Sequence, residues 1–290
     1  MAEPVLAGTA SEQVVNGKKG VVMPIGGAED RTPGGVIMNR FIDIAGGENA
    51  RIMIVATASS EPDAGEDYVD VFRRIGAKSA EIAPLLDRES ANSDDVLARL
   101  REMTGVFITG GDQSRLNKLL VGTRFADVLR DLNRAGLAVA GTSAGASILG
   151  AHMMAGGMSA APPHKGMVEM VAGFGLLENI IIDQHFSQRG RVARLLVTFA
   201  GNPGLIAFGV DENTAIVIRG DGMATAIGEG SVSVIDGRDV YSDYHDLEEG
   251  EILTISGSHI HVLAPGRIFD LNRRVVLHLH QEQAPLASTR

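Results

Sequence analysis

The feature that most constrains the fold is a series of short, unbroken apolar segments, each ending in a glycine-rich or polar turn. Because apolar and polar residues do not alternate within them, these segments are typical of strands covered on both faces of a sheet. The segments are GVVMPIGG (20–27), RIMIVATAS (51–59), GVFITGG (105–111), LAVAGTS (137–143), NIIIDQHF (179–186) and LIAFGVDE (205–212).

Helical patterns lie between these predicted strands. They cover residues 35–47, 93–103, 112–120, 124–136 and 189–204, and residues 60–67 (SEPDAGED) are predicted to be a polar loop. Alternation of buried strands with helices predicts an α/β fold with a doubly wound, mostly parallel sheet.

The pattern changes after about residue 213, where short apolar runs are separated by glycine-rich turns. We expect antiparallel strands here that extend or cover the sheet. No linker composition separates the two parts, so residues 20–290 are predicted to form one domain. Residues 1–19 are small and polar and are predicted to form a flexible arm.

Composition excludes several kinds of function. The net charge of −10 argues against a nucleic-acid or anionic-membrane partner, because both require a cationic surface. The absence of cysteine excludes disulfides, thiolate nucleophiles and cysteine-based metal sites. No apolar run reaches the ~18 residues of a membrane span, and the first residues lack a signal-peptide pattern. The sequence therefore predicts a cytoplasmic protein.

One segment carries a recognisable catalytic pattern. Gly141-Thr142-Ser143-Ala144-Gly145 matches G-x-S-x-G, in which a sharp strand-to-helix turn presents a serine hydroxyl at a helix N-terminus. We expect Ser143 to be a nucleophile, with the competing interpretation that the segment is a small-residue turn without chemistry. The N–H of Ala144 is a candidate oxyanion donor, and Gly111, in the neighbouring TGGDQ turn, is the candidate for the second donor.

A serine nucleophile needs a base and an acid that orients it. All eight histidines follow Ser143, and His185 alone ends a predicted buried strand, so it is the preferred base. Asp183, Asp211 and Glu212 are candidate acids that the residue pattern does not separate. The chain order of serine, histidine and Glu212 would differ from that of the α/β-hydrolases.

Two H-x-H pairs, His259/His261 and His278/His280, would each share a strand face and are a possible metal pattern. No acidic residue stands at a ligand spacing beside them, and they lie far from the glycine-rich strand ends. We therefore expect no metal and no cofactor.

Taken together, GTSAGA, TGGDQ, IIDQHFSQRGRVARL and GVDENTA resemble the cyanophycinases, serine peptidases of the peptidase E group. The resemblance runs from about residue 25 to residue 215 and implies a fold similar to the class I glutamine amidotransferases. It implies Ser143 as nucleophile, His185 as base and Glu212 as acid, and also a homodimer.

The resemblance also implies a substrate, cyanophycin, which is a poly-aspartate chain with arginine on each side-chain carboxyl. The implied reaction is exopeptidase cleavage of the backbone to β-Asp-Arg dipeptides through an acyl-enzyme. The positions implied to contact substrate are Gln113, Asp183, Gln184, Arg189, Arg191 and Arg194. Arginine side chains suit the free α-carboxylates of the polymer, and Glu29, Asp30 and Asp183 are candidates for its guanidinium groups.

Two alternative functions stay open at this point. A peptidase E-like enzyme would cleave Asp-X or isoaspartyl peptides instead of the polymer. A noncatalytic protein would use the glycine-rich turns to bind a phosphate or nucleotide, although the sequence lacks G-x-x-x-x-G-K-[ST] and G-x-G-x-x-G.

Overall fold

The computed structural model describes residues 20–59, 63–157 and 161–277. The predicted arm, residues 1–19, and the pair His278/His280 lie outside these ranges. The helices are α1 (Val36–Ile44), α2 (Glu66–Arg74), α3 (Asp94–Glu102), α4 (Gln113–Leu120), α5 (Arg124–Arg134), α6 (Ala144–Ser147) and α7 (Val192–Gly201). None of these helices is both long enough and apolar enough to cross a membrane.

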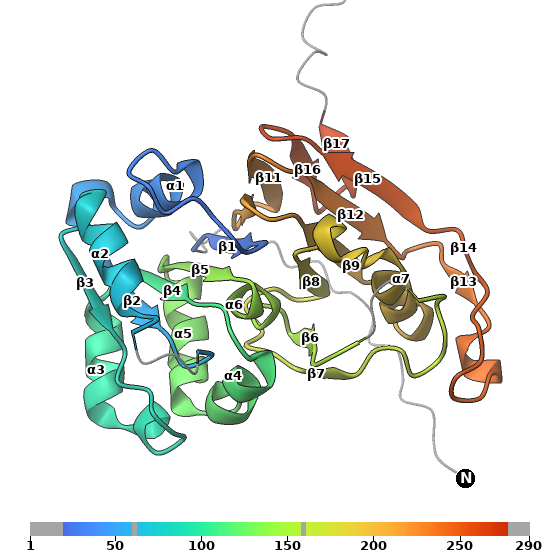
Figure 1. The fold of residues 1–290 in the computed structure, drawn as a ribbon, viewed down its shortest axis with the longest axis horizontal. Helices are drawn as coiled ribbons and strands as arrows, with labels where there is room; N and C mark the ends of the chain where they lie inside the picture. Colours follow the sequence, from blue (N-terminus) through green and yellow to red (C-terminus); the bar gives the residue numbers. More distant parts are fainter. Residues whose placement is uncertain (1–19, 60–62, 158–160, 278–290) are drawn as a thin grey trace, which may run out of the picture.

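A nine-stranded sheet forms the centre of the molecule, in the order β17-β16-β11-β10-β1-β5-β4-β2-β3 (Figure 1). Its parallel part contains β1 (Val22–Ile25), β2 (Arg51–Val55), β3 (Ser79–Ile82), β4 (Gly105–Ile108) and β5 (Ala138–Thr142). Its antiparallel part contains β10 (Thr214–Ile218), β11 (Met223–Gly228), β16 (Ile268–Asp270) and β17 (Val275–Leu277). The predicted fold class is therefore confirmed.

A second sheet has the order β15-β12-β9-β8 and was not anticipated as a separate unit. It contains β8 (Ile180–Gln184), β9 (Ile206–Val210), β12 (Val232–Asp236) and β15 (His259–Leu263). The expectation that the segments 179–186 and 205–212 join the main sheet was wrong, because β10 occupies the edge of β1 where they would pair. Two short ladders join β6 (His152–Met154) to β7 (Met170–Ala172) and β13 (Tyr241–Ser242) to β14 (Ile255–Ser256).

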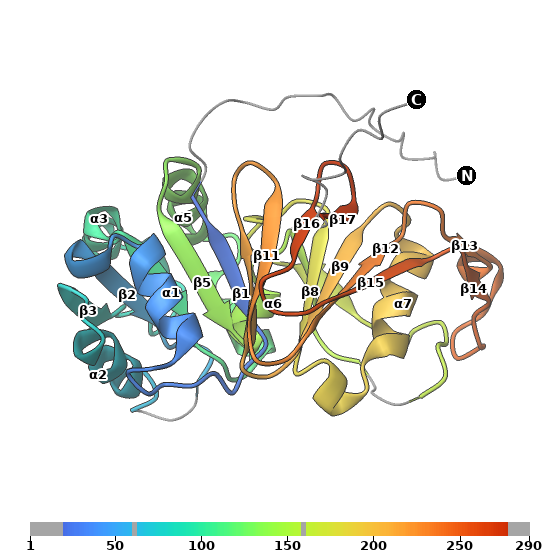
Figure 2. The same cartoon turned by 90° about the horizontal axis from the view of Figure 1, so that it is seen from above.

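Alternate residues of the parallel strands face opposite layers of helices. Ile54 packs in a cluster with Phe41 of α1 and Phe72 of α2, whereas the next residue, Val55, packs in a cluster with Leu97 of α3. Helices α1 and α2 therefore cover one face of the parallel strands, and α3, α4 and α5 cover the other. Figure 2 shows α1 in front of these strands and α5 behind them. Burial on both faces explains the unbroken apolar runs.

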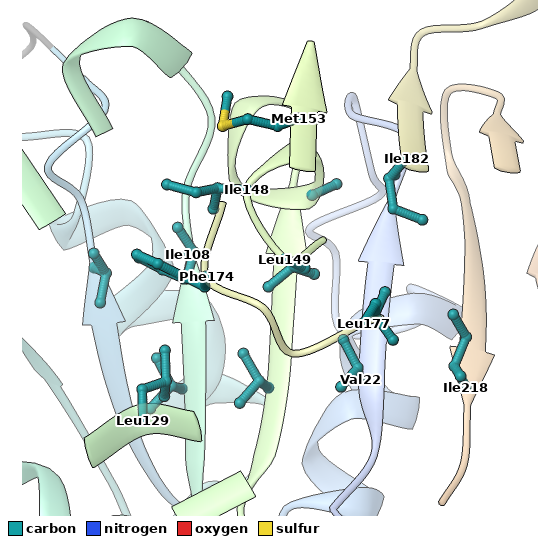
Figure 3. Close-up of a cluster of buried hydrophobic side chains, with 14 of the residues drawn as sticks. Val22, Ile108, Leu129, Ile148, Leu149, Met153, Phe174, Leu177, Ile182 and Ile218 are labelled. Carbon is teal, nitrogen blue, oxygen red and sulfur yellow. The ribbon is translucent and has the colours of Figure 1, made fainter. Parts of the chain in front are cut away.

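The two sheets pack against each other through apolar side chains. Ile182 of β8 and Phe208 of β9 belong to the same buried cluster as Ile218 of β10, and Figure 3 shows Ile182 and Ile218 together with Val22 and Leu177 in this cluster. Helix α7 covers the other face of the second sheet. This packing sets the end of β8 beside the ends of β1 and β5. The single-domain assignment of residues 20–290 stays a prediction.

Candidate active site

The strand-to-helix turn at Ser143 needs both flanking glycines. A Cβ on Gly141 would lie 2.0 Å from the carbonyl oxygen of Gly145, and a Cβ on Gly145 would lie 2.2 Å from the carbonyl oxygen of Ile108. Ser143 itself has φ 52° and ψ −116°, a backbone conformation that costs energy in a non-glycine residue. The tight turn between β5 and α6 therefore fixes the place of one hydroxyl at the carboxyl end of the sheet.

His185 follows β8 directly, and its ring approaches that hydroxyl. The Nε2 atom of His185 lies 3.1 Å from Oγ of Ser143. The backbone of His185 has φ 48°, and its N–H donates to the carbonyl oxygen of Gly26 at 2.8 Å. Gly26 directly follows β1, so the contact holds the end of β8 against the main sheet.

Glu212 supplies the acid on the far side of the imidazole. Its Oε1 atom lies 2.6 Å from Nδ1 of His185. An ionised carboxylate only accepts hydrogen bonds, so Nδ1 carries the proton and Nε2 is left to accept from the hydroxyl of Ser143. Of the three candidate acids, Asp183 and Asp211 bond to other groups, and Glu212 alone contacts the ring.

The neighbouring turn contains two glycines in tight surroundings, and one of them, Gly110, passes close to Ser143. A Cβ on Gly110 would lie 3.1 Å from the Cβ of Ser143, which shows how near the two chains pass. Gly111 has φ +137°, and a Cβ there would lie 2.3 Å from the carbonyl oxygen of Ala58. Among the hydrogen bonds of the described residues, none uses the N–H of Gly111 or Ala144 as donor.

A pocket of about 450 Å³ opens beside Ser143 and His185. Its lining also contains one guanidinium, from Arg31, and the exposed carboxylates of Asp63 and Asp67. The remaining lining residues are Gly27, Ala28, Glu29, Ala64, Tyr68, Thr109, Gly110 and Thr142. The sequence did not point to Arg31, Asp63, Asp67 or Tyr68. Asp67 and Tyr68 lie in the first turn of α2, which was not predicted, and Asp63 lies in the turn before it.

A buried carboxylate lies under this pocket. The Glu29 side chain is fully buried and accepts hydrogen bonds of 2.6 Å from both Tyr68 and Thr142. Arg31 donates to the Tyr68 hydroxyl at 2.6 Å and lies over its ring at 4.2 Å. Burial, followed by the nearby charge of Glu29, raises the pKa of Tyr68, so its hydroxyl remains a donor. Glu29, a candidate for substrate guanidinium, is thus satisfied internally.

Two of the predicted substrate contacts, Arg191 and Arg194, bond to a third, Asp183. Asp183 is fully buried, Arg194 Nε donates to its Oδ2 at 2.7 Å, and Arg191 Nη1 donates to its Oδ1 at 3.1 Å. Both guanidinium groups are at least nine-tenths buried. Burial lowers the pKa of Arg191 to about 10, although Asp183 acts in the opposite direction. This ion cluster was not predicted, because the sequence alone does not distinguish a charged residue that is paired in the core from one on the surface.

Of the other predicted substrate contacts, the side chains of Gln113 and Gln184 make hydrogen bonds within the described part of the protein, whereas that of Arg189 makes none there. Gln113 donates to the carbonyl oxygens of Met154 and Ala155, and the amide oxygen of Gln184 accepts from Arg191 at 3.2 Å. Arg189 is exposed, and no described residue bonds to its side chain.

Asp30, another guanidinium candidate, is used within its own loop. It accepts from the N–H of Thr32 at 2.8 Å and from its hydroxyl at 3.0 Å. The direct role of these residues in substrate binding stays a prediction.

The histidine pair on β15 has an acidic neighbour that sequence spacing did not predict. His259 Nε2 lies 2.8 Å from Oδ2 of Asp239, and the ring of His261 packs against Phe269. Within residues 20–59, 63–157 and 161–277, no group of three or more His, Asp or Glu side chains is placed to hold a metal ion.

Comparison with known proteins places this chain in a family. The sequence model of Peptidase family S51 matches residues 23–226. The cyanophycinase of Synechococcus elongatus is 40% identical over 266 residues, which are 91% of this chain and 83% of that protein. The cyanophycinase of Trichormus variabilis is 39% identical over 262 residues, 89% of this chain and 88% of that one. The predicted resemblance is confirmed.

A solved structure agrees on the fold. The crystal structure of a peptidase from an acI-B1 Actinobacterium superposes with a TM-score of 0.65 at 19% sequence identity. The match covers 87% of this chain and 97% of that one. The glutamine-amidotransferase-like architecture expected from the sequence is therefore confirmed.

Proposed function

The chain belongs to peptidase family S51, a family of serine peptidases, and from this premise we propose that it is a cyanophycinase. The reaction would be exopeptidase hydrolysis of the poly-aspartate backbone of cyanophycin to β-Asp-Arg dipeptides. The single observation that carries the proposal is the continuous contact from Ser143 through His185 to Glu212, at 3.1 and 2.6 Å, in a chain about 40% identical to cyanophycinases.

In the acylation step, the Oγ atom of Ser143 attacks the α-peptide carbonyl carbon between two aspartates while Nε2 of His185 takes the hydroxyl proton. Glu212 accepts the Nδ1–H bond throughout and stabilises the imidazolium by its charge. The carbonyl oxygen becomes an oxyanion, for which the N–H groups of Gly111 and Ala144 are the proposed donors. One such donor is typically worth about 3 kcal/mol of transition-state stabilisation.

The intermediate then collapses, and the imidazolium of His185 gives its proton to the leaving amine as the C–N bond breaks. Water attacks the resulting ester while His185 takes one of its protons. As the ester C–O bond breaks, His185 returns this proton to Oγ of Ser143, which leaves as the free hydroxyl. Both half-reactions use the same groups, so no metal or redox cofactor enters the proposal.

Cyanophycin itself tests the proposal. We expect the purified protein to release β-Asp-Arg as the main product from the first time point, as an exopeptidase does, with mass spectrometry of the products as the measurement. Ser143→Ala should retain the fold and release none. Wild-type release by this variant would contradict the mechanism. Release from small Asp-X peptides, with cyanophycin left intact, would instead support the peptidase E-like alternative.

We also propose a cytoplasmic homodimer without a nucleic-acid or membrane partner. The net charge of −10 supports the absence of binding to polyanions. Sedimentation velocity across a concentration series measures the assembly, and a monomer at all concentrations would contradict the dimer.

A further inference from the structure

Arg31 lines the catalytic pocket, and its hydrogen bonds within the protein use only part of its guanidinium group. Its Nη2 donates to Tyr68, and its Nε lies 3.4 Å from Glu29. Among the described residues, none accepts a hydrogen bond from its Nη1, and its side chain is 43% exposed. The buried residues Tyr68 and Glu29 thus hold the guanidinium group in place. The edge of the group that makes no hydrogen bond to a described residue lies at the pocket that Ser143 also lines.

The buried pair also connects this guanidinium to the nucleophile. Glu29 accepts from Tyr68 through Oε1 and from Thr142 through Oε2. Thr142 is the residue before Ser143, so one carboxylate joins the Arg31 support to the strand end that carries the reactive hydroxyl. A substrate group bound by Arg31 would therefore be at a fixed place relative to Ser143, as orientation of a reacting bond requires.

The other charged side chains exposed in the pocket have the opposite sign. Asp63 and Asp67 line it, and no described residue bonds to their carboxylates. A carboxylate ligand is repelled by them and attracted by Arg31, whereas a guanidinium ligand has the reverse preference. The pocket is accordingly suited to a ligand that carries both a carboxylate and a guanidinium group.

We infer that this pocket is the receptor for one amide-linked arginine unit of the substrate, with its α-carboxylate on Arg31 and its guanidinium on Asp63 and Asp67. This inference rests on the proposed function and names the residues that would give it specificity. It assigns arginine recognition to the loop after β1 and the start of α2, not to the buried cluster in which Arg191 and Arg194 both bond to the carboxylate of Asp183.

Three dipeptides separate the two contacts. β-Asp-Arg carries both charges, β-Asp-agmatine lacks the α-carboxylate, and β-Asp-citrulline replaces the guanidinium by a neutral group of similar shape. We expect calorimetry with the Ser143→Ala protein to show binding of β-Asp-Arg about 10–100-fold tighter than of either analogue, as for loss of one charged hydrogen-bonding group.

The variants assign each preference to a side chain. In Arg31→Gln, β-Asp-Arg and β-Asp-agmatine should bind equally, while the preference over β-Asp-citrulline persists. In Asp63→Asn/Asp67→Asn, that preference over β-Asp-citrulline should disappear instead. Each comparison is a ratio of two dipeptide affinities measured with the same variant. A variant that binds every dipeptide more weakly therefore leaves the ratio unchanged. Arg40→Gln and Asp43→Asn alter exposed side chains of α1 outside the pocket and should keep both ratios.

The outcomes distinguish this inference from the function on which it rests. If the wild-type protein releases β-Asp-Arg from cyanophycin but both ratios survive in the pocket variants, the inference is overturned and the proposed function stands. Equal binding of all three dipeptides to the unsubstituted pocket would also overturn it. If the wild-type protein leaves cyanophycin intact, the proposed function fails first.

Discussion

Gly27 lies against the imidazole of His185 so closely that a Cβ at this position would be 2.4 Å from the ring atom Cε1. Gly27 also has φ +100°, in the left-handed region that favours glycine. The turn after β1 therefore packs against the ring of His185 and supports it in the orientation in which Nε2 faces Ser143.

Gly27→Ala should displace the ring of His185 and lower turnover. A displacement of about 1 Å in a reacting group costs on the order of 100-fold in rate. Gly76→Ala is the matched control, because Gly76 has φ +97° but nothing within 4 Å of its Cβ position. The measurement is kcat for β-Asp-Arg release, and similar losses in the two variants would show that backbone strain, not the ring contact, is responsible.

Glu212→Gln should lower kcat by about 10²- to 10⁴-fold, because a neutral amide no longer stabilises the imidazolium that forms during acylation. The 2.6 Å contact with Nδ1 supports an effect of this kind. Glu48→Gln removes an exposed carboxylate elsewhere and should have no effect. Single-turnover kinetics measure the acylation step, and an unchanged rate in Glu212→Gln would remove this residue from the mechanism.

Asp183→Ala should be strongly destabilising, since it leaves the guanidinium groups of Arg191 and Arg194 buried without their carboxylate. Breaking a buried ion pair costs about 3–5 kcal/mol, whereas an exposed pair is worth about 0–1 kcal/mol. Asp94→Ala removes the exposed partner of Arg124 and is the control. Urea unfolding measures both, and equal losses of unfolding free energy would contradict the buried cluster.

Asp211 should make the free energy of unfolding depend on pH in the acidic range. Burial alone would raise the pKa of Asp211, but hydrogen bonds from the N–H and hydroxyl groups of Ser187 and Ser231 outweigh it and lower the pKa below its usual value. A carboxyl whose pKa is lower in the folded state stabilises the fold above its unfolded pKa of ~3.9, and this contribution is lost as the pH falls through the folded pKa.

Asp211→Asn should therefore cost about 2 kcal/mol at neutral pH, as expected for hydrogen bonds to a charged group. The difference from the wild type should shrink as the pH falls below ~4. Chemical unfolding at a series of pH values gives both curves. A constant difference across this range would show that the contribution of Asp211 does not come from its charge.

Several features followed from the sequence because they are local. The unbroken apolar runs predicted the strands at 51–59, 105–111 and 137–143, and the G-x-S-x-G spacing predicted the turn at Ser143, since only glycines fit beside it. The helix α2 was missed, although Glu66–Arg74 carries a usable signal: Tyr68, Val69, Val71 and Phe72 lie at helical spacing, with acidic residues before them and basic residues after.

Only the tertiary structure decided which distant groups meet. The residue pattern did not separate Asp183, Asp211 and Glu212, and Glu212 was implied only by the family resemblance. The packing of β8 and β9 in a second sheet places Glu212 alone against His185. The same packing buried Arg191 and Arg194 and left Arg31 facing the pocket. Local sequence determines backbone conformation through sterics and apolar periodicity, but charge pairing depends on distance and burial, which exist only after the chain has folded.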